Sequence, residues 1–249
     1  MTGLLRGTGD FFRGVRILLS TRRLWPYVWI PVLINTVVYA LVVGAGVYFF
    51  GDLMQLLLPV GDAWYVSVLR FFGWIVFSVV IVFGIYLTFF VVATIIASPF
   101  NEMLSAKYEE LKTGRKVAEG LGVMAAVWQE VKRLVLYLVA LGALVLVTSV
   151  LSVIPVLNLV VPVLWALFTG FVSALEFLSY TFDRRGMSLR AKFSYMRRTL
   201  GRCQGFGLAV AGAMMIPVLN LAVIPCAVVG ATHLYLETGL EVDPHKGQP

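Results

Sequence analysis

The sequence predicts an all-α integral membrane protein with two long transmembrane helices, two Pro/Asn-broken helical hairpins inserted part-way into the bilayer, and amphipathic interfacial helices. Three observations indicate this fold class. Of the 249 residues, 60% are hydrophobic and 13% are charged, whereas roughly 25% are charged in an average soluble domain. Uncharged runs longer than a membrane span recur along the chain. The hexapeptide Ile-Pro-Val-Leu-Asn-Leu occurs twice inside such runs, at 154–159 and 216–221. We expect residues 1–249 to form one membrane domain.

Residues 1–23 are expected to form an amphipathic helix on the membrane surface. Leucine and phenylalanine side chains recur there at helical spacing, with arginines between them. This pattern is typical of a helix that lies in the interface and anchors the chain. The arginines also interrupt any apolar signal-peptide core, so the segment is expected to remain in the mature protein.

Residues 24–51 and 71–101 are expected to be the two spanning helices. They contain 28 and 31 residues without a charge, and a span requires about 20. Residues 102–133 are polar, with six basic and five acidic side chains. An apolar stripe at helical spacing within 102–133 predicts a surface helix that leads into the next apolar run.

Residues 134–178 and 203–236 each contain one copy of the hexapeptide and are expected to be hairpins. Two full crossings need about 40 residues and a turn. The second segment has 34 residues, which is too few, so we expect it to enter and leave the membrane on one side. The first segment is long enough for two crossings, but the shared hexapeptide favours one architecture for both. Whether the first hairpin crosses fully is left open.

Each hexapeptide combines a helix breaker with a polar side chain. Pro155 and Pro217 each remove a helical hydrogen bond, and Asn158 and Asn220 can satisfy the backbone groups that are freed. Non-helical backbone is tolerated at membrane depth only where protein buries it or water reaches it. The four residues are therefore candidates for a transport pathway, and simple capping is the alternative role.

Residues 179–202 are expected to be a basic connector between the hairpins, and residues 237–249 a tail. Ser188 is a plausible N-cap for a helix within the connector. The segment contains seven basic residues and one acid, Asp183. The seven are Arg184, Arg185, Arg190, Lys192, Arg197, Arg198 and Arg202. By the positive-inside rule, this connector and the N-terminus are expected in the cytoplasm.

The longest of three notable stretches runs from Phe206-Gly207 through Met215-Ile216-Pro217-Val218-Leu219-Asn220 to Val229-Gly230-Ala231-Thr232. The other two are Ser98-Pro99-Phe100-Asn101 and Tyr180-Thr181-Phe182-Asp183. Together they resemble landmarks of the CysZ-like sulfate permease family, and the first stretch is the most specific. The resemblance implies part-way hairpins, oligomeric assembly, a bacterial inner-membrane location and sulfate uptake for cysteine biosynthesis.

The resemblance also implies an anion site between the N-terminal helix and the first span, at a glycine-leucine-arginine motif. Here that junction reads Thr21-Arg22-Arg23-Leu24-Trp25-Pro26, which has no glycine and has its arginines nearer the N-terminus. Sulfate does not titrate near pH 7, so arginines, hydroxyls and backbone amides must recognise it. Four consecutive residues supply these groups and are the candidate anion-binding residues: Ser20, Thr21, Arg22 and Arg23. The alternative is that the arginines only fix the orientation of the span.

No catalytic, cofactor or metal-binding pattern is present in the sequence. Walker A, HExxH and GxSxG motifs are absent, and the only cysteines, Cys203 and Cys226, have no metal-binding spacing. The basic residues flank apolar runs, so the net charge of +7 does not indicate a nucleic-acid partner.

The sequence therefore favours an oxyanion transporter or channel that is not an enzyme and is not driven by ATP. We expect membrane lipids as partners, and the resemblance implies a homo-oligomer. A part-way hairpin cannot line a pore by itself, so the long helices or neighbouring subunits would have to complete any pathway. The alternative function is a non-transporting scaffold whose basic surface helices bind anionic lipid or a partner protein.

Overall fold

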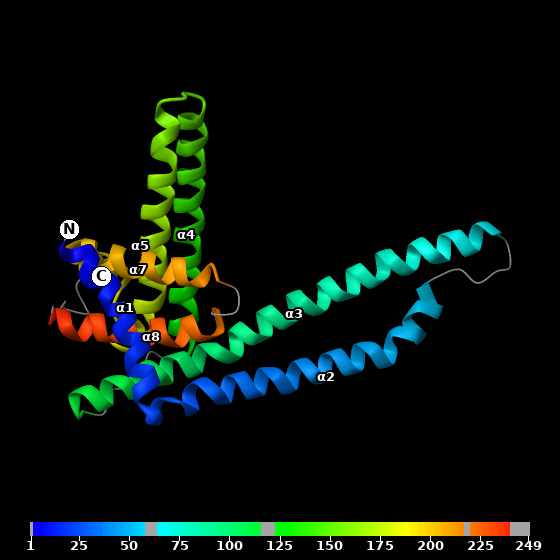
Figure 1. Cartoon of the computed structure of the whole chain (residues 1–249), viewed down its shortest axis with the longest axis horizontal. Coiled ribbons are helices and arrows are strands. Elements are labelled where there is room, and N and C mark those ends of the chain that lie inside the picture. Colours follow the sequence, from blue (N-terminus) through cyan, green and yellow to red (C-terminus); the bar gives the residue numbers. More distant parts are fainter. Residues whose placement is uncertain (1, 58–63, 116–122, 217–219, 240–249) are drawn as a thin grey trace. The chain divides into compact units, whose positions relative to one another are not determined.

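The computed structural model describes residues 2–57, 64–115, 123–216 and 220–239, and every regular element in these ranges is a helix (Figure 1). The elements in chain order are α1 (Thr2–Ser20), the 3-10 turn η1 (Arg22–Leu24), α2 (Pro26–Leu57), α3 (Trp64–Thr113), α4 (Val123–Ser152), the 3-10 turn η2 (Leu157–Val160), α5 (Val161–Arg184), α6 (Leu189–Arg198), α7 (Leu200–Met214) and α8 (Asn220–Thr238). The predicted all-α class is confirmed.

Four segments in the described part of the chain are long and apolar enough to cross a membrane. They are Arg22–Gly46, Trp64–Gly84, Leu134–Ser152 and Leu157–Arg184. Little of each is buried inside the protein, so their apolar side chains are available to lipid or to another protein chain. This agrees with the prediction of an integral membrane protein.

The chain divides into two compact units, residues 26–100 and residues 1–25 with 101–249. The first unit contains α2 and most of α3. Helix α3 has 50 residues and continues through Pro99 to Thr113, so it extends beyond the predicted span 71–101 at both ends. A proline removes only one donor from the helical ladder. The helix after Pro99 is stabilised by burial, because Asn101, Leu104 and Ser105 are buried in the second unit.

The first copy of the hexapeptide forms the connection of a helical hairpin. Helices α4 and α5 lie side by side, and residues 153–160 join them at one end (Figure 1). The break therefore separates two helices and does not interrupt one. The apolar segments on either side contain 19 and 28 residues, so a full crossing is compatible with their lengths. The part-way depth of this hairpin stays a prediction.

The second copy, at 216–221, ends in the first two residues of α8, and α8 contacts α7. Pro217 and the two residues after it lie outside the described residues. Helix α7 has 15 residues, which corresponds to about 22 Å at 1.5 Å per residue. The hydrocarbon core of a bilayer is about 30 Å thick. This length is in keeping with part-way insertion, which also stays a prediction.

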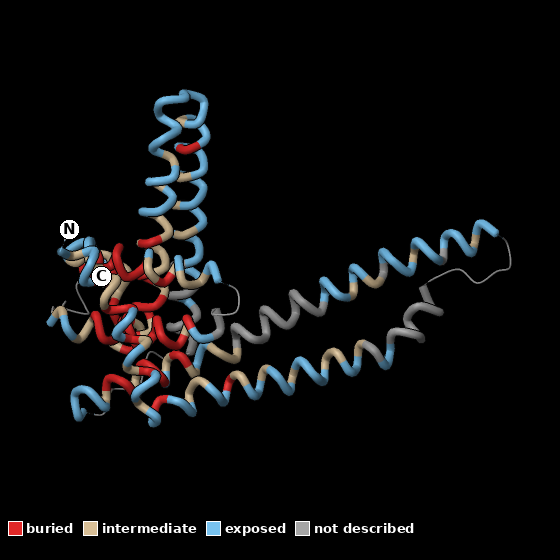
Figure 2. The backbone as a smooth tube through the Cα atoms, in the orientation of Figure 1, coloured by how far each residue is buried: buried red, intermediate tan, exposed pale blue. Residues whose placement is uncertain are grey.

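The core of the second unit forms where α1, α7, α8 and the C-terminal half of α5 pack together (Figure 2). Helix α1 packs against both α7 and α8. It is therefore an integral part of the core in addition to presenting exposed Leu5 and Phe12 on its other face. Its buried residues are Gly7, Asp10, Phe11, Gly14 and Leu18.

Glycines allow the core helices to touch backbone to backbone. A Cβ added at Gly207 of α7 would lie 1.8 Å from the carbonyl oxygen of Gly170 in α5. One added at Gly7 of α1 would lie 1.9 Å from the carbonyl oxygen of Arg202 in α7. Such approaches are typical of helices that associate in membranes through small residues. Any larger side chain at either position requires the helices to move apart.

Gly207→Ala is expected to destabilise the protein, whereas Gly212→Ala on the same helix is not. A Cβ at Gly212 meets nothing within 4 Å, and alanine in a helix is favoured over glycine by roughly 0.5–1 kcal/mol. Overpacking at position 207 should cost about 1–3 kcal/mol. Thermal unfolding of both variants in detergent would measure this. Equal melting temperatures for the two variants would contradict the backbone contact.

Candidate functional site

The four residues of the predicted anion site run from Ser20, the last residue of α1, into the turn η1. Arg22 and Arg23 begin the turn, and both side chains are exposed. Neither forms an ion pair with any residue in the described part of the chain. Ser20 Oγ donates to the Ile17 carbonyl oxygen at 3.2 Å, and the Thr21 side chain makes no capping hydrogen bond. Two guanidinium groups and two hydroxyls thus lie together at the surface.

The residues after the two arginines fix the direction of the junction. Leu24 is completely buried, and Trp25 Nε1 donates a hydrogen bond of 3.0 Å to the carbonyl oxygen of Leu18 in α1. The Leu24 amide also donates to the Thr21 carbonyl oxygen at 3.0 Å. These contacts close a tight turn at the end of α1. The side chains of Arg22 and Arg23 in this turn are exposed.

The predicted break residues divide between described and undescribed positions. Pro155 and Asn158 lie in the exposed connection between α4 and α5. The backbone N–H of Asn158 donates to the Ile154 carbonyl oxygen at 3.0 Å. The backbone carbonyl oxygen of Asn158 accepts from the backbone N–H of Val161. Asn220 is the first residue of α8, and Pro217 lies outside the described residues. No contact described in the structure joins Asn158 to the arginine junction.

A buried ion pair that sequence reasoning missed connects α1 to α7. Asp10 is 1% exposed and accepts two hydrogen bonds from Arg202, from Nε at 2.5 Å and from Nη2 at 2.9 Å. This hydrogen bonding raises the pKa of Arg202 above its ordinary value. A signal was present, because Asp10 is the only acidic residue in the N-terminal 23. It shares the helical face of Gly7 and Gly14.

Two further ion-pair groups neutralise much of the basic connector. Glu109 on α3 accepts from Arg184 Nη2 at 3.0 Å and also pairs with Arg185. Asp183 accepts from Lys192 at 2.5 Å. The predicted N-cap of α6 is confirmed, since Ser188 Oγ accepts from the Ala191 amide at 3.3 Å. The connector is therefore a folded part of the unit, held by acids that lie outside it or at its start.

Polar side chains also meet inside the unit where α3, α5 and α8 come together. The hydroxyl oxygens of Ser105 and Thr232 are 2.7 Å apart, and the hydroxyl oxygen of Thr181 lies within 3.3 Å of both. Tyr108 Oη lies 2.8 Å from His233 Nδ1. Burial raises the pKa of Tyr108 to about 12, and the charge of Glu237 adds to this effect. These groups bond to one another, so their evident role is to join the three helices.

The turn after α1 offers two exposed guanidinium groups and two hydroxyl groups. Among the residues that the structure describes, no group of three histidine, cysteine or acidic side chains is placed to hold a metal ion. The buried acids of the described residues, Asp10 and Glu109, both pair with arginine. The exposed arginines of η1 have no such partner within the described ranges and remain available to a ligand. Arginine binds tetrahedral oxyanions through parallel N–H donors.

The Asp10–Arg202 pair should show strong energetic coupling. Arg202→Met leaves the buried carboxylate of Asp10 with only the more distant Arg13, whose Nη1 is 3.8 Å away, and breaking a buried pair costs about 3–5 kcal/mol. Asp10→Asn removes the charge and should partly relieve that cost, so the double variant is expected to be more stable than Arg202→Met alone. Unfolding in detergent across the four proteins of a double-mutant cycle measures the coupling. Strictly additive effects would contradict a direct pair.

Comparison with known proteins identifies the family of this chain. Residues 10–225 match the family model described as "Sulfate transporter CysZ/Etoposide-induced protein 2.4". A protein of Pseudomonas aeruginosa (strain LESB58) named "Sulfate transporter CysZ" is 33% identical over 213 residues, which cover 83% of this chain and 85% of that protein. A protein of the same name from Vibrio parahaemolyticus is 30% identical over 248 residues, which cover 92% and 94%. The chain therefore belongs to the Sulfate transporter CysZ/Etoposide-induced protein 2.4 family.

Proposed function

We propose that this protein is a sulfate transporter or channel of the bacterial inner membrane that is not driven by ATP. The observation that carries the proposal is the similarity to relatives named "Sulfate transporter CysZ" over most of both chains. The four apolar membrane-length segments support it, and so does the absence of a Walker A motif from the sequence. The transported sulfate would supply cysteine biosynthesis. A non-transporting scaffold is not favoured, because the relatives are named as transporters.

The anion is proposed to bind at Ser20, Thr21, Arg22 and Arg23. Sulfate carries two negative charges and accepts hydrogen bonds on four oxygens. Two arginines without a described acidic partner offer paired N–H donors, and the adjacent hydroxyls can donate as well. The buried Leu24 and the Trp25–Leu18 hydrogen bond hold this turn in place. A rigid backbone lowers the cost of ordering the arginines around the ion.

The pathway across the membrane is proposed to involve the two helix breaks and more than one copy of the chain. Pro155 with Asn158, and Pro217 with Asn220, would place polar backbone at the ends of the hairpins. Hairpins inserted part-way cannot enclose a pore alone. The exposed apolar side chains of α4 and α5 provide surface for contact with another copy, so we propose a homo-oligomer. The N-terminus is proposed to be cytoplasmic.

Replacing both Arg22 and Arg23 with alanine is expected to weaken sulfate binding strongly. Hydrogen bonds to charged groups contribute about 1.5–3 kcal/mol each, so the loss should be at least tenfold in Kd. Binding to the purified protein can be measured by isothermal titration calorimetry. The matched control is Arg6→Ala with Arg16→Ala, because these arginines are also exposed and lie on the preceding helix. Unchanged affinity in the Arg22/Arg23 variant would reject the site.

A cysteine at Asn158 is expected to react with a membrane-impermeant maleimide from the cytoplasmic side only. Asn158 is exposed at the connection of the α4–α5 hairpin, and the proposed part-way insertion leaves this connection without contact with the far side. The native cysteines, Cys203 and Cys226, are both buried, so they should contribute little labelling. The unsubstituted protein serves as the control. Labelling from the far side alone would show that the hairpin crosses the membrane fully.

A further inference from the structure

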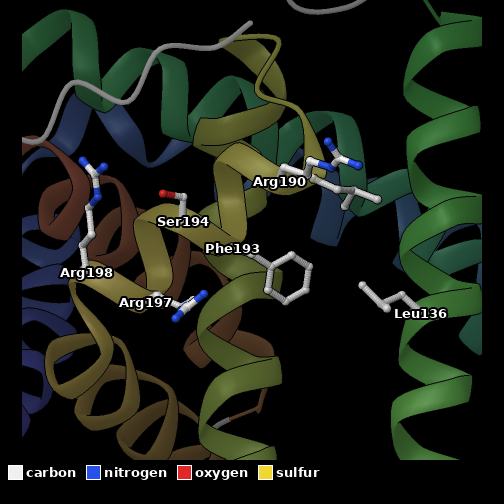
Figure 3. Close-up of a pocket in the computed structure, with 7 residues that line it drawn as sticks. Leu136, Arg190, Phe193, Ser194, Arg197 and Arg198 are labelled. Carbon is white, nitrogen blue, oxygen red and sulfur yellow. The ribbon is translucent and has the colours of Figure 1, made fainter. Parts of the chain in front are cut away.

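A hollow of about 720 Å³ lies between α6 and α4 in the second unit (Figure 3). Part of its lining is apolar and comes from Leu136, Leu189 and Phe193. The rest comes from the polar side chains Arg190, Ser194, Arg197 and Arg198. The lining thus combines three cations and a hydroxyl with an apolar wall, and it contains no carboxylate among the described residues.

The three arginines carry the charge that the connector leaves unneutralised. Of its seven basic residues, four pair with Glu109, Asp183 or Asp10. Arg190, Arg197 and Arg198 are exposed, and none of them forms an ion pair with a residue that the structure describes. All three line the hollow. The remaining positive charge of the connector is therefore carried by residues that line one hollow.

The hollow lies at the level where the polar and apolar parts of α4 meet. Leu136 is the third residue of the membrane-length segment Leu134–Ser152, and Lys132 and Arg133 come directly before that segment. In a bilayer this boundary is where phosphate groups meet acyl chains. A ligand in the hollow would contact cations at one end and hydrocarbon-facing side chains at the other.

Side-chain directions within the hollow favour a ligand with both a charged and an apolar part. Arg190 and Arg197 lie on either side of the Phe193 ring, and Leu136 faces that ring from α4 (Figure 3). Arg198 extends away from the ring. Phe193 stacks on Phe171 of α5, with ring centroids 5.7 Å apart and an angle of 18° between the planes. The aromatic wall is therefore fixed in position.

We propose that this hollow is a binding site for an anionic phospholipid. The phosphate would accept hydrogen bonds from Arg190 and Arg197, and an acyl chain would lie against Phe193 and Leu136 along α4. A free sulfate or phosphate ion would use only the cations and would leave the apolar wall without a role. The proposal concerns a site separate from Ser20–Arg23 and does not depend on sulfate transport.

Native mass spectrometry of the full chain with added lipid tests this site. The wild type is expected to bind phosphatidylglycerol more tightly than phosphatidylcholine. Arg190→Ala with Arg197→Ala should lower the phosphatidylglycerol affinity about fivefold for each arginine removed. Arg190→Lys with Arg197→Lys keeps the charge and should retain most of the affinity. The comparison variant is Arg6→Ala with Arg16→Ala, which removes two exposed arginines from α1 and should lower the phosphatidylglycerol affinity less than Arg190→Ala with Arg197→Ala does.

Equal binding of the two lipids by the wild type would overturn the proposal, as would undiminished phosphatidylglycerol binding in the double alanine variant. Displacement of the lipid by millimolar inorganic phosphate would also overturn it, because a free-anion site would then explain the arginines. Sulfate binding by the same double alanine variant is expected to match the wild type. That measurement separates a failure of the lipid site from a failure of the proposed transport function.

Discussion

Direct backbone contact between helices is the constraint on which the core of this protein depends. At Gly207 and Gly7 the neighbouring carbonyl oxygens occupy the space of a Cβ, so no other residue fits without moving a helix. Lipid provides little hydrophobic driving force for helix association, and close packing must supply it. The buried Asp10–Arg202 pair then fixes the register of α1 on α7. Together these contacts place the turn after α1, and with it the two exposed arginines.

Features that depend on local sequence could be predicted well. Long uncharged runs identified the membrane-length helices, and the proline in the first hexapeptide marked the connection between α4 and α5. Ser188 was recognised as an N-cap, because capping depends on a side chain and a backbone amide three residues apart. In each case the physical cause acts within a few residues, so a short window of sequence contains the information.

Features that depend on tertiary contact could not be predicted in the same way. Asp10 and Arg202 are 192 positions apart, and nothing in either local sequence specifies the other. The burial of α1 depends on glycines in α7, so its amphipathic pattern alone indicated a membrane-surface helix. The continuation of α3 through Pro99 depends on burial of the residues that follow. The candidate anion site is four consecutive residues, and the contacts that close their turn, such as the hydrogen bond from Trp25 to Leu18, are not evident from those residues alone.

The basic connector illustrates how the structure divides one sequence feature between two roles. Four of its basic residues stabilise the fold, because buried or half-buried acids neutralise them: Arg184, Arg185, Lys192 and Arg202. Arg190, Arg197 and Arg198 remain at the surface and line the hollow. A count of basic residues cannot separate these groups, whereas their ion-pair partners do.

Sulfate flux into proteoliposomes that contain only the purified protein tests most directly whether this chain transports sulfate without ATP. We expect sulfate to enter these vesicles in the absence of ATP, and faster than it enters protein-free vesicles. The rate of entry should either saturate as the sulfate concentration rises or depend on the imposed gradient. Repeating the measurement with and without an imposed proton gradient distinguishes a channel from a proton-coupled symporter. Uptake equal to that of protein-free vesicles under both conditions would contradict a transport function for this chain.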